Sequence, residues 1–147
     1  MEALEDGKME RGALAAVAER WMSFWRRASL ADFDAVHSER FVDHSAAGRS
    51  ADRDGLRLGV VELYGAFPDF MAESDVVAID TAEGLVTIRW TATGHCQAPF
   101  LGVAARGQMV RFTGMELIRI VQGRVMERWG EWDEAAILAQ LKGVLPS

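Results

Sequence analysis

At 147 residues and 16.2 kDa, with half of its residues hydrophobic, the chain is long enough to form one domain around a buried core. Its formal net charge of −6 argues against a nucleic-acid partner, because such partners are bound by basic surfaces. The single cysteine, Cys96, allows no intrachain disulfide, and the acidic segment at residues 1–10 has no apolar stretch of the kind found in a secretion signal. No apolar run reaches the length that a membrane span requires. We therefore expect one cytoplasmic domain over residues 1–147, with residues 1–9 flexible and with neither nucleic acid nor membrane as partner.

The first half of the sequence predicts helices. Apolar residues recur at three- and four-residue steps from Glu10 to Ala28, which predicts an amphipathic helix of about five turns. Ser29 and Asp32 resemble a helix N-cap, so a short second helix is expected to follow them. This second helix would include His37 as a surface residue.

A short strand or turn is expected next, in RFVDHSAAGRS at residues 40–50, and it leads into a loop. A third helix is predicted from Asp52 to about Ala66. Pro68 ends it, because the residue before a proline avoids helical geometry.

The apolar period changes to two after this point, and the rest of the chain predicts strands. Strands are expected at Asp75–Asp80, Leu85–Thr93, Met109–Val121 and Arg124–Trp132, and a closing helix at Asp133–Lys142. Helices followed by an antiparallel meander indicate an α+β domain whose helices pack on one face of a curved sheet.

Gln122-Gly123 predicts a two-residue hairpin turn, because glycine readily takes the positive φ that such turns need. Regular pairing beyond this turn would place Glu116, Glu127 and Trp129 on one apolar face. The two carboxyl groups would then lie roughly 5–8 Å apart. Their repulsion amounts to about two pKa units, so one would stay protonated near neutrality and act as acid beside a base. In the alternative interpretation each acid pairs with an arginine, such as Arg89, Arg119 or Arg128, and only ties strands together.

Several ordered segments carry a family resemblance. They are Phe41-Val-Asp-His44, Ala66-Phe-Pro-Asp-Phe70, Gly94-His95, Phe100-Leu-Gly102, Gly107, Gly114-x-Glu-x-x-Arg119, Gly123-Arg-Val-x-Glu127-x-Trp129-x-x-x-Asp133 and Gln140-Leu141. Together they resemble the SnoaL-like polyketide cyclases, within the nuclear-transport-factor-2-like α+β barrels.

The resemblance implies a cone-shaped α+β barrel. N-terminal helices would pack on a strongly curved antiparallel or mixed sheet that encloses one deep pocket, in a homodimer formed through the outer sheet face. It also implies an aspartate near the end of the last strand that acts as acid and base in the cyclases. In this sequence that position falls on Gly130 or on Asp133, and in the first case the family's acid is missing.

The residues that we expect at the site follow from the hairpin and from the resemblance. Glu116 or Asp133 would remove a proton next to a carbonyl group, and His44 would donate to the forming enolate oxygen. Asp133 has a second interpretation as the N-cap of the last helix. Substrate contacts are expected from Trp25, Tyr64, Phe67, Trp90, His95, Glu127 and Trp129.

These residues favour a cofactor-independent enzyme that acts on a small apolar or aromatic carbonyl compound by aldol cyclisation, isomerisation or dehydration. The sequence has no phosphate-binding loop and no Cys/His cluster, so we expect no nucleotide cofactor and no metal. Three alternatives remain open: a non-catalytic binding or dimerisation module of the same fold, a ketosteroid isomerase-like enzyme, and an epoxide hydrolase. The last would hold a water beside a carboxylate–arginine–carboxylate set, and the chain has no asparagine and one tyrosine to help position that water.

Overall fold

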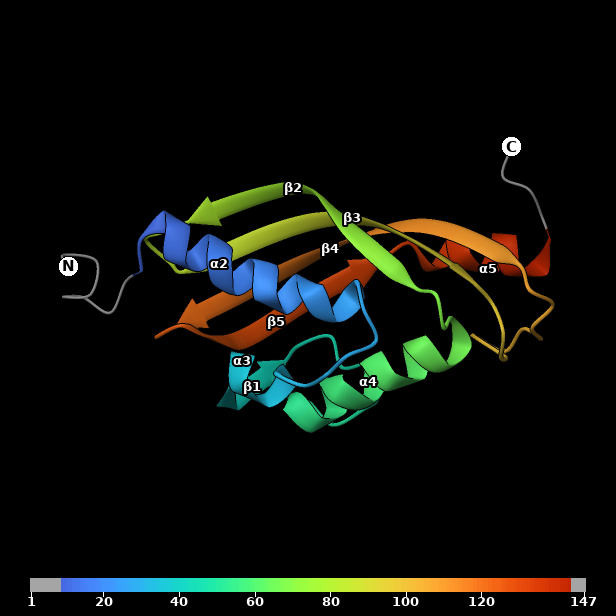
Figure 1. Ribbon diagram of the computed structural model, residues 1–147, viewed down its shortest axis with the longest axis horizontal. Helices are drawn as coiled ribbons and strands as arrows, with labels where there is room; N and C mark the ends of the chain where they lie inside the picture. The colour runs from blue at the N-terminus through green and yellow to red at the C-terminus, as the bar shows by residue number, and fades with distance from the viewer. Residues whose placement is uncertain (1–8, 144–147) are drawn as a thin grey trace.

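The computed structural model of the chain describes residues 9–143 and is an α+β fold with an open five-stranded sheet in that range. The strands are β1 (His37–Asp43), β2 (Met71–Asp80), β3 (Leu85–His95), β4 (Met109–Val121) and β5 (Arg124–Trp132). Their order in the sheet is β1-β5-β4-β3-β2, and β1 runs parallel to β5 while the other pairs are antiparallel. The expected α+β class with a mixed, curved sheet is confirmed (Figure 1).

The helices are α2 (Arg11–Met22), a 3-10 turn η1 (Ser23–Trp25), α3 (Phe33–Val36), α4 (Arg53–Ala66) and α5 (Glu134–Lys142). Side chains cap three of them: Glu10 accepts from the Ala13 amide, Asp52 from Gly55 and Asp133 from Ala136. The first helix is shorter than expected because the chain tightens into η1 after Met22. No helix between residues 9 and 143 combines the length and hydropathy needed to cross a bilayer.

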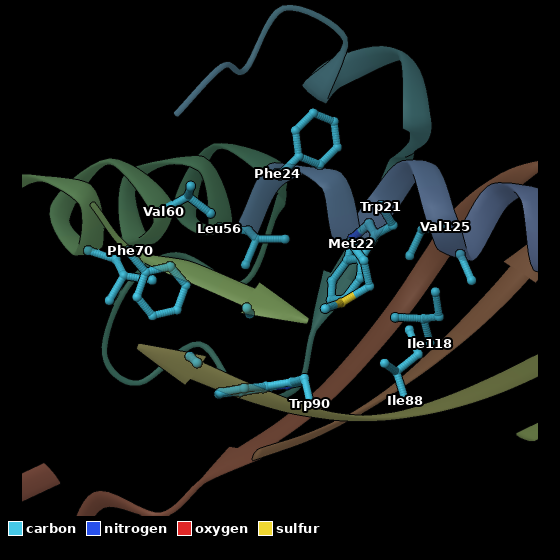
Figure 2. Packing of buried hydrophobic residues seen from close by; sticks show 14 of the residues in the cluster. Trp21, Met22, Phe24, Leu56, Val60, Phe70, Ile88, Trp90, Ile118 and Val125 are labelled. Carbon is cyan, nitrogen blue, oxygen red and sulfur yellow. The ribbon is translucent and has the colours of Figure 1, made fainter. Parts of the chain in front are cut away.

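The core lies between the helices and one face of the sheet. On β3 the alternating residues Val86, Ile88, Trp90 and Ala92 are buried, as their period of two predicts. Figure 2 shows the side chains that meet them from α2, α4, β4 and β5: Trp21, Met22, Leu56, Val60, Ile118 and Val125. We call this the inner face of the sheet, and the opposite face the outer face.

The β4–β5 hairpin corrects the predicted register. Gln122 and Gly123 both have positive φ, at 51° and 80°, and the pairs next to the turn are those expected. The register then shifts, because Ile120 pairs with Val125 whereas Arg119 pairs with Glu127, which leaves Met126 as an extra residue on β5. A one-residue bulge moves every later side chain of the strand to the other face.

The bulge therefore reverses the predicted faces of β5. Glu127 and Trp129 lie opposite Arg119 and Leu117 on the outer face, so the prediction that they share a face with Glu116 is wrong. Arg128 instead lies opposite Ile118 on the inner face.

His37 was also predicted wrongly as a surface residue of a helix. It is the first residue of β1 and is fully buried, because α3 spans only four residues and ends at Val36. Its Nε2 accepts from Trp21 Nε1 at 3.0 Å, and its Nδ1 donates to the Phe33 carbonyl at 2.7 Å. These two partners define a neutral tautomer, and burial lowers the pKa of His37 to about 4.

Candidate functional site

A cavity of about 680 Å³ opens between α4, the turn after β1 and the end of β5. Such a volume is in the range that holds an organic molecule of drug size. It is lined by Trp25, His44, Ser45, Ala47, Arg49, Leu56, Gly59, Val60, Glu62, Leu63, Phe100, Leu101, Glu116, Arg128, Gly130, Glu131, Trp132 and Glu134. A smaller chamber of about 40 Å³ shares Trp25, Leu63, Glu116, Arg128 and Trp132 with it and adds Met22, Phe70, Ala72 and Trp90. Glu116 and Arg128 therefore lie where the cavity meets the core.

Three charged side chains form a buried set on the inner face. Arg128 Nε donates to Glu116 Oε1 at 2.8 Å, and Arg128 Nη1 lies 3.1 Å from both carboxylate oxygens of Asp43. The side chains of Arg128, Glu116 and Asp43 are only 14%, 7% and 1% exposed. Parallel pairing of β1 with β5 places Asp43 directly beside Arg128, and the bulge in β5 turns Arg128 inward.

Trp90 holds the other oxygen of Glu116. Its Nε1 donates to Glu116 Oε2 at 3.1 Å across the β3–β4 pair. The indole reaches that far because it lies over Gly114, where a Cβ would stand 2.6 Å from Trp90 Cη2. A side chain at Gly114 would displace the ring, so this glycine is needed for the close approach.

Gly130 lets the ion pair pack directly against the backbone of β5 at the cavity wall. A Cβ built there would lie 2.6 Å from Glu116 Oε1 and closer still to Arg128 Nη2. None of the three hydrogen bonds that Arg128 makes to Glu116 and Asp43 uses Nη2. Glu116 Oε1 and Arg128 Nη2 therefore fill the space that a side chain at position 130 would take, and both residues line the cavity.

The set has an unusual charge balance. With both acids ionised the three side chains would carry a net charge of −1 in a buried place, and protonation of Glu116 makes them neutral. Burial raises the pKa of Glu116, although Arg128 and Trp90 oppose the rise, and the charge of Asp43 adds to it. Burial alone would lower the pKa of Arg128, but the two carboxylates outweigh it and raise that pKa.

Three residues predicted at the site lie together toward the outer face instead. His44 Nε2 lies 2.9 Å from Glu127 Oε2, and Arg119 Nε donates to Glu127 Oε1 at 2.8 Å. The His44 ring stacks on Trp129 at 4.6 Å between centroids. The hydrogen bond from His44 lowers the pKa of Glu127, with Arg119 acting in the same direction. Of these three predicted residues only His44 also lines the cavity.

The other predicted residues divide between the cavity, the core and the surface. Trp25 lines both chambers and Trp90 lines the smaller one. Phe67 is buried in the core, and Tyr64 donates from its hydroxyl to the Phe24 carbonyl at 3.0 Å, with burial raising the pKa of Tyr64 to about 12. His95 pairs with Asp69 at 2.7 Å in an exposed position.

The resemblance left two positions open for the family's catalytic aspartate, Gly130 and Asp133. Gly130 pairs with Glu116 and lines the cavity. Asp133 is exposed and caps α5 by accepting from the Ala136 amide at 3.1 Å, and neither chamber includes it.

The sequence interpretation did not select Asp43 and Arg128 as site residues. Arg128 was considered only as an ion-pair partner of Glu116 or Glu127. Its side chain points to the inner face because of the bulge in β5, which cannot be predicted from the residue types there. A cluster of three or more His, Cys, Asp or Glu side chains suited to a metal ion does not occur in the described part of the chain.

Comparison with known proteins identifies similar sequences and structures. The sequence matches the profile of the SnoaL-like polyketide cyclases over residues 15–141. No relative is found among proteins with curated descriptions. The fold is similar to that of TsrD from Streptomyces laurentii, with a TM-score of 0.83, 17% identity, and coverage of 94% of this chain and 100% of that one.

Two other solved structures are more similar in sequence. AclR from Streptomyces galilaeus, a proposed hydroxylase, has a TM-score of 0.80 and 28% identity, with 94% of this chain and 89% of that chain covered. IdmH from Streptomyces antibioticus, a proposed polyketide cyclase, has a TM-score of 0.75 and 25% identity, with 88% and 98% covered.

Proposed function

The chain belongs to the SnoaL-like polyketide cyclase family, and on that premise we propose that it is a cofactor-independent enzyme that moves a proton on a carbonyl substrate. The observation that carries the proposal is the pairing of Glu116 with Arg128 at the cavity wall, where Glu116 Oε1 and Arg128 Nη2 both pack against Gly130. Proton abstraction next to a carbonyl needs a base for the C–H group and a donor for the oxygen. These two atoms supply both.

In this proposal the Glu116 carboxylate removes a proton from the carbon next to the substrate carbonyl. The electron pair of that C–H bond moves to the carbonyl oxygen, and the enolate oxygen accepts a hydrogen bond from Arg128 Nη2. Aldol ring closure, isomerisation and dehydration can all proceed from this enolate. Glu116, now protonated, returns its proton at a later step.

The surroundings of Glu116 suit this role. A carboxylate with an ordinary pKa is a weak base, and the burial that raises the pKa of Glu116 makes it a stronger one. The cavity walls contributed by Trp25, Phe100 and Trp132 suit a flat, apolar or aromatic substrate. Arg128 and Trp90 fix the orientation of the carboxyl group.

The structure favours Arg128 over His44 as the oxygen donor. His44 lines the cavity, but its Nε2 lies against Glu127 and its ring stacks on Trp129. Asp133 is favoured as a helix cap rather than as the base, because its carboxylate is used by the Ala136 amide.

Deuterium exchange into 2-tetralone tests the proposal, because this flat aromatic ketone has an acidic C–H group next to its carbonyl. Proton NMR in D2O should show faster exchange with the protein than without it. Glu116→Gln should lower the catalysed rate at least about tenfold, since positioned general bases contribute about 100-fold or more. Glu73→Gln is the matched control, because Glu73 is an exposed glutamate of β2 opposite Thr91. Binding of 2-tetralone without faster exchange would favour the non-catalytic binding module.

Epoxide hydrolysis is a second candidate function, favoured by the Asp43–Arg128–Glu116 set itself. A carboxylate–arginine–carboxylate arrangement can activate a water with one acid and protonate the epoxide oxygen with the other. Ser45 lines the cavity and can help hold the water, although its Oγ already accepts from the Gly130 amide at 2.9 Å. Turnover of styrene oxide to its diol, abolished in Glu116→Gln, would support this reaction, and unchanged styrene oxide would exclude it for this probe.

We further propose a homodimer through the outer face. By register this face presents the exposed side chains of Met71, Val76, Met109 and Met115. Exposed apolar side chains gathered on one sheet face are typical of an interface. Light scattering after size-exclusion chromatography should give twice the chain mass, and Met115→Lys should reduce it to that of a monomer. A monomer in the unmodified protein contradicts the proposal.

A further inference from the structure

Two arginines among the described residues line the cavity, and they differ in how their N–H groups are used. Arg128 directs Nε and Nη1 at Glu116 and Asp43. The guanidinium of Arg49 makes no hydrogen bond to any residue within 9–143, and its Nε is buried without a partner. Its nearest acid is Glu62, whose Oε1 lies 3.7 Å from Nη1, beyond hydrogen-bond distance. A buried guanidinium N–H without a partner is costly, and the Nη groups beside it have only the exposed Glu62 near them, so a ligand in the cavity can use them.

The local sequence holds the Arg49 guanidinium against α4. Arg49 follows Gly48, whose φ is +91°, and its amide donates to the Ala46 carbonyl at 3.1 Å. The guanidinium then lies over Gly59 in the middle of α4, where a Cβ would stand 2.8 Å from Cζ and from Nη2. Glycine in a helix interior costs about 1 kcal/mol relative to alanine. Here it makes the room that lets Arg49 lie at the cavity wall.

We propose that Arg49 binds a carboxylate on the ligand of this cavity, so that the substrate class is a flat aromatic compound bearing an acid group. A planar guanidinium matches a carboxylate with two parallel hydrogen bonds, which a neutral ester or ketone cannot make. The aromatic walls at Trp25, Phe100 and Trp132 would hold the rings. The inference rests on the proposed function for the reaction at Glu116, but the binding that it describes can be measured without any reaction.

The exposed acids that line the cavity repel a carboxylate ligand only weakly. Glu62, Glu131 and Glu134 also line the cavity, but all three are exposed, so water and salt screen their charges. Glu62 is the one that reaches Arg49, with a side chain 59% exposed. It therefore competes weakly with a carboxylate ligand for the same guanidinium.

Calorimetric titration of the full chain with 2-naphthoate and with methyl 2-naphthoate tests the proposal. The two compounds share their rings and differ in charge. The unmodified protein should bind the acid at least about tenfold more tightly than the ester. Arg49→Gln should remove this preference and leave the affinity for the ester within about twofold, which also shows that the variant is folded.

Gly59→Ala is a second variant that leaves Arg49 in place. Its methyl group would push the guanidinium off the helix, so the preference for the acid should fall, while alanine stabilises the helix. Glu62→Gln should raise the affinity for 2-naphthoate severalfold, because it removes the competing carboxylate. Loss of affinity in Glu62→Gln counts against the proposal.

Three results would overturn the assignment of Arg49: equal affinity of the unmodified protein for acid and ester, parallel losses of both in Arg49→Gln, or binding of neither compound. Failure of the proposed reaction gives a different pattern. In that case 2-naphthoate still binds more tightly than its ester and Arg49→Gln still removes that preference, but 2-tetralone exchange is not accelerated.

Discussion

Replacing Arg128 by methionine tests whether the buried ion pairs of Arg128 with Glu116 and Asp43 stabilise the fold. Arg128→Met keeps most of the side-chain volume and removes the partner of two acids that are 7% and 1% exposed. Removing one member of a buried ion pair costs about 3–5 kcal/mol, because the remaining charges lose their compensation. For a domain of this size that corresponds to a fall in Tm of roughly 6–20 °C.

Urea unfolding followed by tryptophan fluorescence measures this loss at pH 7, and the pH dependence gives a second check. Without Arg128 the pKa of Glu116 rises further, and a group with a raised folded-state pKa binds more protons when folded. The variant should therefore recover part of its stability as pH falls below that pKa.

Arg89→Met is the matched control, because Arg89 makes one bond of 2.8 Å to Asp75 with side chains 45% and 33% exposed. An exposed pair of this kind contributes at most about 1 kcal/mol. Equal losses in the two variants, or a loss below 1 kcal/mol for Arg128→Met, would refute the buried set as described.

The remaining predictions concern His37, Asp133 and the turn between β4 and β5. The pKa of His37 is about 4 in the folded protein and near 6.5 in the unfolded chain, so the unfolded chain binds the proton more tightly. The free energy of unfolding should therefore fall by about 3 kcal/mol as pH drops from 6.5 to 4. This pH dependence should be absent in His37→Gln, and an NMR titration of His37 near pH 6.5 in the folded protein would contradict it. Asp133→Ala should cost about 1 kcal/mol in urea unfolding through loss of the α5 cap, with 2-tetralone exchange unchanged, whereas a tenfold slower exchange would restore Asp133 as a catalytic candidate. Gly123→Val should destabilise the hairpin by at least about 1 kcal/mol because φ is +80° there, and an unchanged Tm would contradict that conformation.

The regular elements could be predicted because each depends on local pattern. The third helix, β4, β5 and the turn at Gln122-Gly123 follow from apolar period, a capping aspartate and a glycine with positive φ, and the structure confirms them. The buried face of β3 follows from strict alternation in the same way.

The direction of side chains on β5 could not be predicted, because it depends on one extra residue in a pairing between strands. Met126 has nothing in its type that marks a bulge, yet it moves Glu127 outward and Arg128 inward. The interpretation that each acid pairs with an arginine describes both contacts, since Glu127 binds Arg119 and Glu116 binds Arg128. What it did not predict is that the second pair is buried at a cavity wall.

His37 illustrates the same limit for burial. A histidine next to a short apolar helix has no sequence signal for a buried strand, and its environment comes from Trp21, sixteen residues earlier. Asp43 enters the sequence interpretation only as part of the segment Phe41-Val-Asp-His44, and its partner Arg128 lies 85 residues away. Contacts of this range depend on how the strands are ordered in the sheet.

The pH dependence of kcat/KM for 2-tetralone exchange tests the central claim about Glu116 most directly. If Glu116 is the base in a buried site, the rate should rise with pH through an inflection above 4.5, and Glu116→Gln should lose that inflection together with the activity. An inflection that persists in Glu116→Gln, or a rate equal to that of the unmodified protein, would show that the proton moves elsewhere.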